Sequence, residues 1–429
     1  MSDLYRRLKA AKERGEAPRE GSSPGGRRQR PFGQNSDGAD WRVRRREEPP
    51  LPRERRAPAG FTLSDGVYLR RQTVRFEELA PREQLLGAEE PVHIPPRLAP
   101  GVRREEAEVA LPLGSHLFFD LEATGLSTGA GNVAFLLGLG HLSRDGLELV
   151  QWLLPDYPYE PELLASVTAE LHQLEERLGP VTLVSYNGRS FDTPLLQTRM
   201  LMNGIPFEPP RELDLLPISR RFWRGELENC SLGSVEERVL AVERELDIPG
   251  AYVPLRYFDY LRSGRPEPLL EVVAHHRQDV VSLYLLLCRI ELILRGAPGL
   301  PGRGPDQFEL AKLLIEREPL PEGRKRGEGI LRELALEGKS ERGALYFGRY
   351  LRRSGDPATA YEVWIRAFRL RGSVAAGIMA AKMLEHEFRE YEKALSLVEE
   401  LLAKPESSPR LTDALLHRQE RLRRRSASS

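Results

Sequence analysis

Apolar runs separated by turn residues predict a mixed α/β domain in the middle of the chain. The predicted segments, in chain order, are strand-like runs at 117–119, 135–142 and 147–154, helical periodicity over 160–178, a β-branched run at 181–186, a helix from about 192 to 203, a strand-like run at 212–216 and a helix from about 268 to 295. Ser143-Arg144-Asp145-Gly146 is typical of a hairpin turn between two of these strands. Periodicity predicts the elements and leaves their order in the sheet open.

Two acids end the first predicted strand. Asp120 and Glu122 follow an apolar aromatic run directly and precede Thr124-Gly125. Because residues two apart on a strand point to the same face, both carboxylates face one spot. A cation such as Mg²⁺ or Mn²⁺, which prefers oxygen ligands, would relieve their repulsion. Pairing with nearby arginines is the commoner explanation of such a motif when it stands alone.

Two further acids lie at the edges of later elements. Asp192 follows the turn Asn187-Gly188 and lies near a predicted helix N-terminus, where an aspartate can also be a simple cap. Asp279 lies in the long helix, with His275 four residues before it and His276 three before it, so either imidazole shares roughly its face. An unpaired charge beside apolar segments is costly. The four acids therefore suggest a shared cation site.

The motifs, taken in order, resemble the three Exo motifs of the DEDD 3′–5′ exonuclease superfamily, which has a ribonuclease H-like fold. More narrowly, FFDLEATGLSTGAGNVAFLLGLG at 118–140, the following Gln151-Trp152-Leu153-Leu154 and SYNGRSFDTPLLQTR at 185–199 resemble the YprB-type ribonuclease H-like domain. The resemblance covers about Leu113 to Leu294. It implies a mixed sheet flanked by helices and supplies the strand order that periodicity leaves open.

The resemblance also implies a metal-dependent 3′–5′ exonuclease that cleaves single-stranded DNA or RNA from a 3′ end with two divalent cations, Mg²⁺ or Mn²⁺. The implied metal ligands are Asp120, which bridges both ions, Glu122, Asp192 and Asp279. The residues implied to hold the terminal nucleotide are Thr124, Gly125, Asn187 and Phe191, with Phe191 packing or stacking. An arginine or lysine at the centre of the carboxylates would contradict this interpretation.

The catalytic histidine is expected to orient or deprotonate the attacking water. The histidine subclass of the superfamily spaces this residue five positions before the last aspartate, whereas His275 lies four before Asp279, in the slot that tyrosine occupies in the tyrosine subclass. His275 is the first choice and His276 the second.

The segments before and after the predicted α/β domain differ from it in composition and in predicted structure. Residues 1–60 carry 16 Lys/Arg and nine Asp/Glu with abundant Gly, Pro and Ser, which predicts a disordered basic tail. The predicted domains are this tail, an adapter at 61–112, the ribonuclease H-like domain at 113–296, a helical domain at 306–405 and a basic C-terminal tail at 406–429. Within the helical domain Gly343 aligns with Gly377 and Ala360 with Ala394 at an offset of 34, the period of tetratricopeptide (TPR) helix pairs. The repeats are expected to bind a protein partner or to be a structural cap.

Whole-chain composition indicates a cytoplasmic protein without a membrane role. Lys+Arg and Asp+Glu are equal at 64 each, so no global charge attracts nucleic acid. The two cysteines lack metal-ligand spacing, and neither a secretion signal nor a membrane span is evident. A cluster at 220–224 with three arginines and Trp223 fits either a single-strand grip or an ordinary surface. The alternative to a nuclease is a non-catalytic nucleic-acid-binding or TPR protein-interaction scaffold.

Overall fold

The computed structural model describes residues 55–81, 84–92, 111–125, 129, 131–244, 248–316, 321–404 and 409–427. Of the predicted basic tail at 1–60, all but the last six residues lie outside this set.

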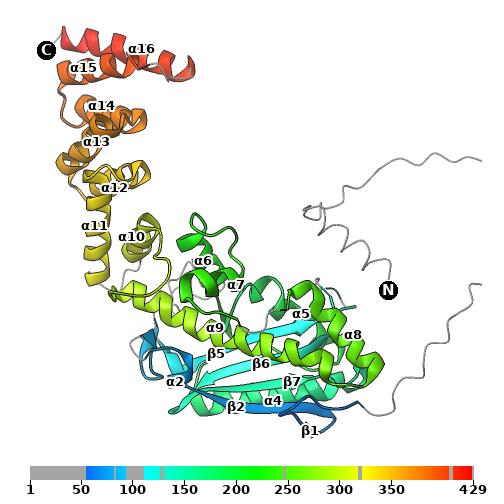
Figure 1. The fold of residues 1–429 in the computed structure, drawn as a ribbon. Helices are drawn as coiled ribbons and strands as arrows, with labels where there is room; N and C mark the ends of the chain where they lie inside the picture. Colours follow the sequence, from blue (N-terminus) through cyan, green and yellow to red (C-terminus); the bar gives the residue numbers. More distant parts are fainter. Residues whose placement is uncertain are drawn as a thin grey trace, which may run out of the picture. The chain divides into compact units, whose positions relative to one another are not determined.

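A seven-stranded mixed sheet forms the centre of the fold, in the order β1-β2-β7-β6-β5-β8-β9 (Figure 1). Its strands are β1 Thr62–Ser64, β2 Val67–Arg75, β5 His116–Ala123, β6 Ala134–Leu142, β7 Gly146–Leu153, β8 Thr182–Ser185 and β9 Arg211–Asp214. Strands β5, β8 and β9 run parallel to one another, whereas β5, β6, β7 and β2 pair antiparallel. This topology confirms the predicted ribonuclease H-like α/β fold.

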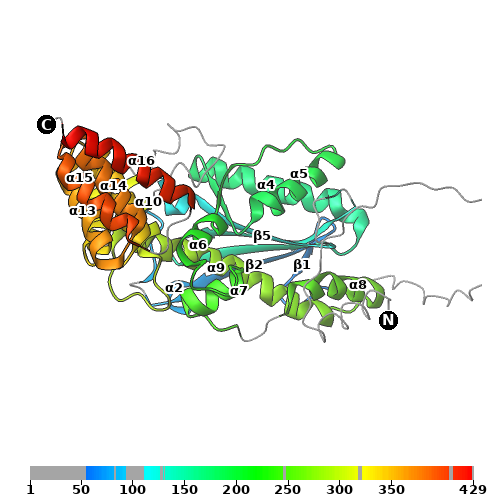
Figure 2. The same cartoon turned by 90° about the horizontal axis from the view of Figure 1, so that it is seen from above.

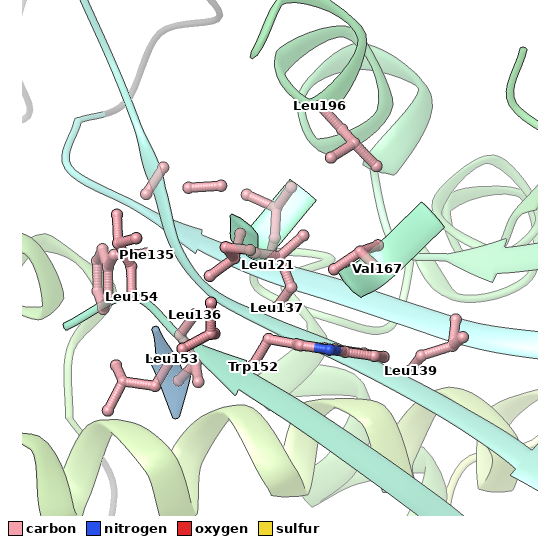
Figure 3. Packing of buried hydrophobic residues seen from close by; sticks show 14 of the residues in the cluster. Leu121, Phe135, Leu136, Leu137, Leu139, Trp152, Leu153, Leu154, Val167 and Leu196 are labelled. Atoms are coloured by element: carbon pink, nitrogen blue, oxygen red, sulfur yellow. The ribbon is translucent and has the colours of Figure 1, made fainter. Parts of the chain in front are cut away.

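Helices cover both faces of the sheet, which Figure 2 shows nearly edge-on. Helices α4 Glu160–Leu178 and α5 Asp192–Met202 lie on one side, and α8 Val253–Ser263 and α9 Leu270–Arg295 lie on the other. The strand leucines and Trp152 pack between the sheet and these layers, against Val167 of α4 and Leu196 of α5 (Figure 3). Most of α9 is buried on all sides, as expected for a helix that is apolar around its circumference.

The remaining elements are short or lie in the helical part of the chain. They are α2 Phe76–Leu79, β3 Pro91–Val92, β4 Leu111–Pro112, α6 Leu216–Trp223, α7 Leu232–Val235, a π-helical turn Glu236–Leu240, 3-10 turns at Leu113–Ser115, Tyr157–Tyr159, Gly188–Ser190, Gly250–Tyr252 and Glu267–Leu269, α10 Gln307–Glu316, α11 Pro321–Leu336, α12 Glu341–Arg353, α13 Pro357–Arg371, α14 Val374–His386, α15 Tyr391–Leu402 and α16 Pro409–Ser426.

The segment expected to be an adapter, 61–112, contributes two strands to the same sheet. β2 pairs with β7 over eight residues, from Tyr68 opposite Leu153 to Arg75 opposite Gly146. An uncovered β7 would present unpaired backbone groups at the sheet edge, and β2 satisfies them. The sheet therefore begins well before residue 113, where the sequence placed the start of the domain.

The C-terminal part is helical, and the offset of 34 residues matches successive helix pairs. Gly343 and Gly377 lie in α12 and α14, and Ala360 and Ala394 are buried in α13 and α15. A Cβ on Gly377 would come within 2.8 Å of Leu401 and Phe368, so the helices cross closely there. These observations fit the expected repeat; its assignment to the TPR class remains a prediction.

The segment expected as a basic C-terminal tail contains helix α16, which packs on the preceding helices. Its Leu415 and Leu422 are buried in the same apolar cluster as α12–α15. Arg418 and Arg421 of α16 pair with the buried Glu385 of α14. Leu411 of the same helix is partly buried against this cluster. These few leucines are spread among many arginines, which is why composition alone suggested a tail.

Two further observations bear on function. Trp223 is fully buried and its indole N–H donates to the Arg303 carbonyl at 3.2 Å, while Arg221 pairs with Glu309. Trp223 therefore cannot stack on a nucleic-acid base, and the single-strand grip considered for 220–224 is wrong. Among the described helices, none combines the length and the apolar character needed to cross a membrane.

Candidate active site

Strand β5 presents Asp120 and Glu122 on one face. Both side chains are partly exposed, whereas Leu121 between them is buried on the opposite face. Asp120 lies opposite Gly138 of the neighbouring β6, and Glu122 lies opposite Leu136. The strand alternation thus places the two carboxylates side by side, as the sequence predicted.

Helix α9 brings a histidine and an aspartate to the same place. His275 Nε2 lies 3.2 Å from Asp279 Oδ2 and 3.9 Å from Glu122 Oε1. One ligand atom from each of these three side chains falls within 4.8 Å of the others, a spacing that one metal ion could bridge. Carboxylate oxygens are the donors that suit Mg²⁺ or Mn²⁺, so Glu122 and Asp279 fit such a cation, with the His275 imidazole beside them.

Asp192 and Asp120 belong to the same electrostatic cluster. Burial raises the pKa of Asp120 well above its usual value, and the charges of Asp279, Asp192 and Glu122 raise it further. The pKa of Glu122 is raised in the same way, by burial and then by Asp279 and Asp192. The charges of Asp192 and Asp279 thus act on Asp120 and Glu122. The direct grouping of side chains is that of Glu122, His275 and Asp279.

A second layer of acids on β9 supports the turn before Asp192. Glu212 accepts hydrogen bonds from the Ser185 hydroxyl at 2.5 Å and the Thr193 hydroxyl at 2.8 Å. Asp214 accepts the Asn187 backbone N–H at 2.8 Å. Burial, followed by the charges of Glu212 and Asp214, raises the pKa of Asp192 to about 8.

Glu212 and Asp214 were not among the site residues predicted from the sequence. A signal was present, because the two acids alternate at the end of a strand-like run as Asp120 and Glu122 do. Their partners, however, lie 19 to 27 residues earlier in the chain, and only the parallel pairing of β8 with β9 brings them together.

The two neighbouring histidines have different surroundings. His276 is fully buried; its Nδ1 accepts a hydrogen bond from Gln151 Nε2 at 2.9 Å, and its Nε2 lies 3.2 Å from the Asp120 carbonyl oxygen. Since Gln151 also donates to the Val273 carbonyl, the ring proton lies on Nε2 and is donated to Asp120. Burial lowers the pKa of His276 to about 3. His276 thus supports the β5 backbone, and His275 faces the carboxylates.

Gly138 makes room for the His276 ring. A Cβ at this position would lie 2.4 Å from His276 Cε1, a distance that side chains do not tolerate. Gly138 is also the residue paired with Asp120 in the sheet. The glycine in the predicted strand 135–142 therefore has a packing function that the apolar pattern did not reveal.

The four residues expected to hold a nucleotide lie around the acids with defined partners. Thr124 Oγ1 accepts the Val133 N–H at 3.0 Å, and Gly125 lies so close to Asn132 that a Cβ would be 2.3 Å from its Oδ1. Asn187 has a left-handed backbone, with φ of 68°. Phe191 packs against the main apolar core. Their roles toward a substrate remain predictions.

An arginine also lies at the site, which the sequence analysis did not expect. Arg244 pairs with Asp279 Oδ1, and its Nη1 lies 2.7 Å from His275 Nδ1. An arginine at the centre of the carboxylates would contradict the cation site predicted from the sequence, and Arg244 does reach one of the four acids, through Asp279 Oδ1. The other oxygen of Asp279, Oδ2, still faces His275 and Glu122, so the three-residue group remains able to hold a cation.

The raised pKa values predict an unusual pH dependence of stability. Between the ordinary Asp pKa of 3.8 and the folded-state pKa of Asp192 of about 8, the folded protein retains a proton that the unfolded chain has released. In chelator, the free energy of unfolding should therefore fall as pH rises through this window, by up to about 1.4 kcal/mol per pH unit for each such group. Urea unfolding at pH 6 and pH 8 measures this. Saturating Mg²⁺ should flatten the slope, and a stability that rises with pH in chelator would contradict the prediction.

The fold and the acid cluster define a ribonuclease H-like protein. A family model of the RNase_H superfamily matches residues 117–290. The chain is also 30% identical over 318 residues to YprB of Bacillus subtilis (strain 168), an alignment that covers 72% of this chain and 75% of YprB. The chain belongs to the ribonuclease H superfamily and, within it, to the family of YprB. This fold suggests hydrolysis of nucleic acid, and proteins that have it usually bind divalent metals.

Proposed function

We propose that the protein is a metal-dependent 3′–5′ exonuclease that hydrolyses single-stranded nucleic acid. The observation that carries this proposal is the grouping of Glu122 and Asp279 with His275, supported by the effect of the charges of Asp192 and Asp279 on Asp120 and Glu122. A binding scaffold has no need for Asp120, Glu122 and Asp192, whose pKa values are raised by burial and by neighbouring acids, because such charges destabilise the fold. The direction of digestion follows from the resemblance to the DEDD exonucleases.

Each site residue has a proposed task. Asp120 would hold both cations, with Glu122, Asp192 and Asp279 completing their ligands. Bound there, two divalent ions would lower the pKa of the attacking water and offset the negative charge on the leaving 3′ oxygen. His275 would take the proton of that water at Nε2, the ring atom that faces Asp279 and Glu122.

We propose that His276 holds the backbone of β5 in place and does not act as the general base. Its Nε2 proton is donated to the Asp120 carbonyl, and Gln151 occupies its other nitrogen. Neither ring nitrogen is therefore available to a water molecule. The choice between the two histidines, which the sequence left open, is resolved in favour of His275 in this proposal.

Degradation of end-labelled oligonucleotides tests the function. The full chain with Mn²⁺ should shorten 5′-labelled single-stranded DNA or RNA stepwise, whereas a 3′-terminal phosphorothioate should block it. The Asp120→Ala, Glu122→Ala double variant should lose on the order of 10³-fold or more in rate, since it removes the cation ligands from β5. The matched control, Glu162→Ala with Glu176→Ala, removes two exposed acids of α4 and should leave the rate unchanged.

Three results would argue against the proposal. Internal cuts in a circular single strand would show an endonuclease. Equal binding of the oligonucleotide by the wild type and the double variant, with no cleavage by either, would favour the non-catalytic scaffold. Cleavage that survives the double substitution would point to a contaminating nuclease.

A further inference from the structure

Arg244 makes three charged or polar contacts at the site. It lies shortly after the π-helical turn Glu236–Leu240, and its side chain is only 10% exposed. Its Nε lies 2.5 Å from Glu236 Oε2, its Nη1 lies 2.7 Å from His275 Nδ1, and its Nη2 contacts Asp279 Oδ1. All three guanidinium nitrogens are thus engaged, two of them by residues of the proposed catalytic site.

The contact with His275 determines where the imidazole proton lies. A guanidinium group donates hydrogen bonds and cannot accept them, so His275 Nδ1 must be the acceptor and a neutral ring carries its proton on Nε2. That Nε2 lies 3.2 Å from Asp279 Oδ2, to which it can donate. A ring in this tautomer cannot take a proton from water at Nε2. While Arg244 keeps this contact, His275 cannot act as the base proposed above, so the base function requires that the contact be released.

The contact with Asp279 gives the acid cluster an internal cation. Arg244 neutralises one oxygen of Asp279, and its charge partly opposes the rise in the pKa of Asp120 and Glu122. A divalent cation that binds Asp279 and Glu122 would lie close to the guanidinium and would be repelled by it. Both cations favour the same carboxylates, so each weakens the binding of the other, and this coupling is reciprocal.

The backbone that carries Arg244 departs from regular geometry. The turn before it is π-helical, and Ala241 has a left-handed φ of 55°, a conformation that is unfavourable for a residue other than glycine. The buried Glu236 contacts Nε of the guanidinium, whereas His275 and Asp279 contact Nη1 and Nη2. Arg244 therefore keeps one partner when it separates from the other two.

We propose that Arg244 is a displaceable counter-ion of the catalytic site: binding of a divalent cation releases its guanidinium from Asp279 and His275, and only then can His275 act as a base. This inference rests on the proposed function, because it concerns the regulation of the same site. In the metal-free protein Arg244 stabilises the crowded acids and holds His275 in the inactive tautomer. Metal binding and activation of the histidine are one coupled step.

Mn²⁺ affinity in the absence of nucleic acid tests the displacement. Electron paramagnetic resonance of free Mn²⁺ should show that Arg244→Gln, in the full chain, binds Mn²⁺ about tenfold more tightly than the wild type, equivalent to about 1.4 kcal/mol. Arg244→Lys, which keeps the charge, should stay close to the wild type. The matched control Arg277→Gln removes a charge on α9 two residues before Asp279 and should change the affinity much less. Unchanged or weaker binding by Arg244→Gln would show that Arg244 is a fixed support and would overturn the inference.

A second measurement reads the tautomer in the wild-type chain and uses a variant only to assign the signal. Nitrogen-15 NMR of histidine-labelled protein reports the tautomer, and the signal absent from His275→Asn identifies His275. We expect the Nε2-protonated form in chelator and a change at His275 Nδ1 on saturation with diamagnetic Mg²⁺. An unchanged His275 signal at saturation would overturn the inference.

These results separate the inference from the proposed function. If Mn²⁺ displaces Arg244 as described but no oligonucleotide is hydrolysed, only the proposed exonuclease activity fails. If hydrolysis requires Asp120 and Glu122 but Arg244→Gln leaves the Mn²⁺ affinity unchanged, only the role of Arg244 fails.

Discussion

Asp192→Asn is expected to lower the rate of nucleic-acid hydrolysis by about 10³-fold and, at the same time, to make the metal-free protein more stable. The activity falls because an amide is a weaker ligand for a hard cation than a carboxylate. The stability rises because Asp192 is buried beside Glu212 and Asp214, and these surroundings raise its pKa to about 8. Near pH 8 a substantial share of the protein bears the unfavourable charge, and asparagine removes it at nearly constant volume.

Paired measurements check the two halves of this expectation. Single-turnover cleavage with saturating Mn²⁺ gives the rate, and urea unfolding in chelator at pH 8 gives the stability. The matched control is Asp145→Asn in the exposed hairpin between β6 and β7, which should change neither. A variant that loses both activity and stability would mean that Asp192 is a structural cap of α5, the simpler explanation that its sequence position allowed.

Substitution of the two neighbouring histidines by asparagine is expected to have opposite consequences. His275→Asn should fold normally and lose about 10²- to 10⁴-fold in rate, because His275 is the proposed general base. His276→Asn should lower the free energy of unfolding by roughly 2–4 kcal/mol, because its ring fills a closed space and links Gln151 to the Asp120 carbonyl.

Urea unfolding and single-turnover rates, measured on both variants, separate a chemical role from a structural one. His276→Gln, which fills more of the space left by the ring, should recover part of the stability lost in His276→Asn. If His276→Asn were as stable as the wild type but inactive, His276 would be the base and our assignment would be reversed.

The elements of the central domain could be predicted from local pattern. The apolar run at 135–142 corresponds to β6 at Ala134–Leu142, and the periodic segment 160–178 coincides with α4 at Glu160–Leu178. Apolar residues recur with a period of two in a strand with one buried face and with a period of 3.6 in a helix with one buried face. This signal does not depend on which element covers the face. Residues 61–112 carry short strand-like pieces, but their place in the sheet left no local signal, because the pairing of β2 with β7 joins residues more than 70 positions apart.

The four acids of the site could be identified from the sequence, but the residues that contact and position them could not. Asp120 and Glu122 are recognisable as charges at the end of an apolar strand, and the charges of Asp192 and Asp279 raise the pKa of both. Glu212, Gln151 and Arg244 contact the site through residues between 19 and 125 positions away. Nothing in the local sequence of Arg244 distinguishes it from the many other arginines of the chain.

The sequence by itself determined the α/β class of the central domain, the helical C-terminal part and the four carboxylates, because each is recorded in residue type and spacing. Only the tertiary structure decided which histidine faces those carboxylates. Neighbouring residues on a helix point about 100° apart, so the direction in which α9 packs on β5 buries His276 under Asp120 and leaves His275 beside Asp279. The tertiary structure also placed Arg244 beside the acids, because the packing of the chain brings these opposite charges together, whereas their order in the sequence does not.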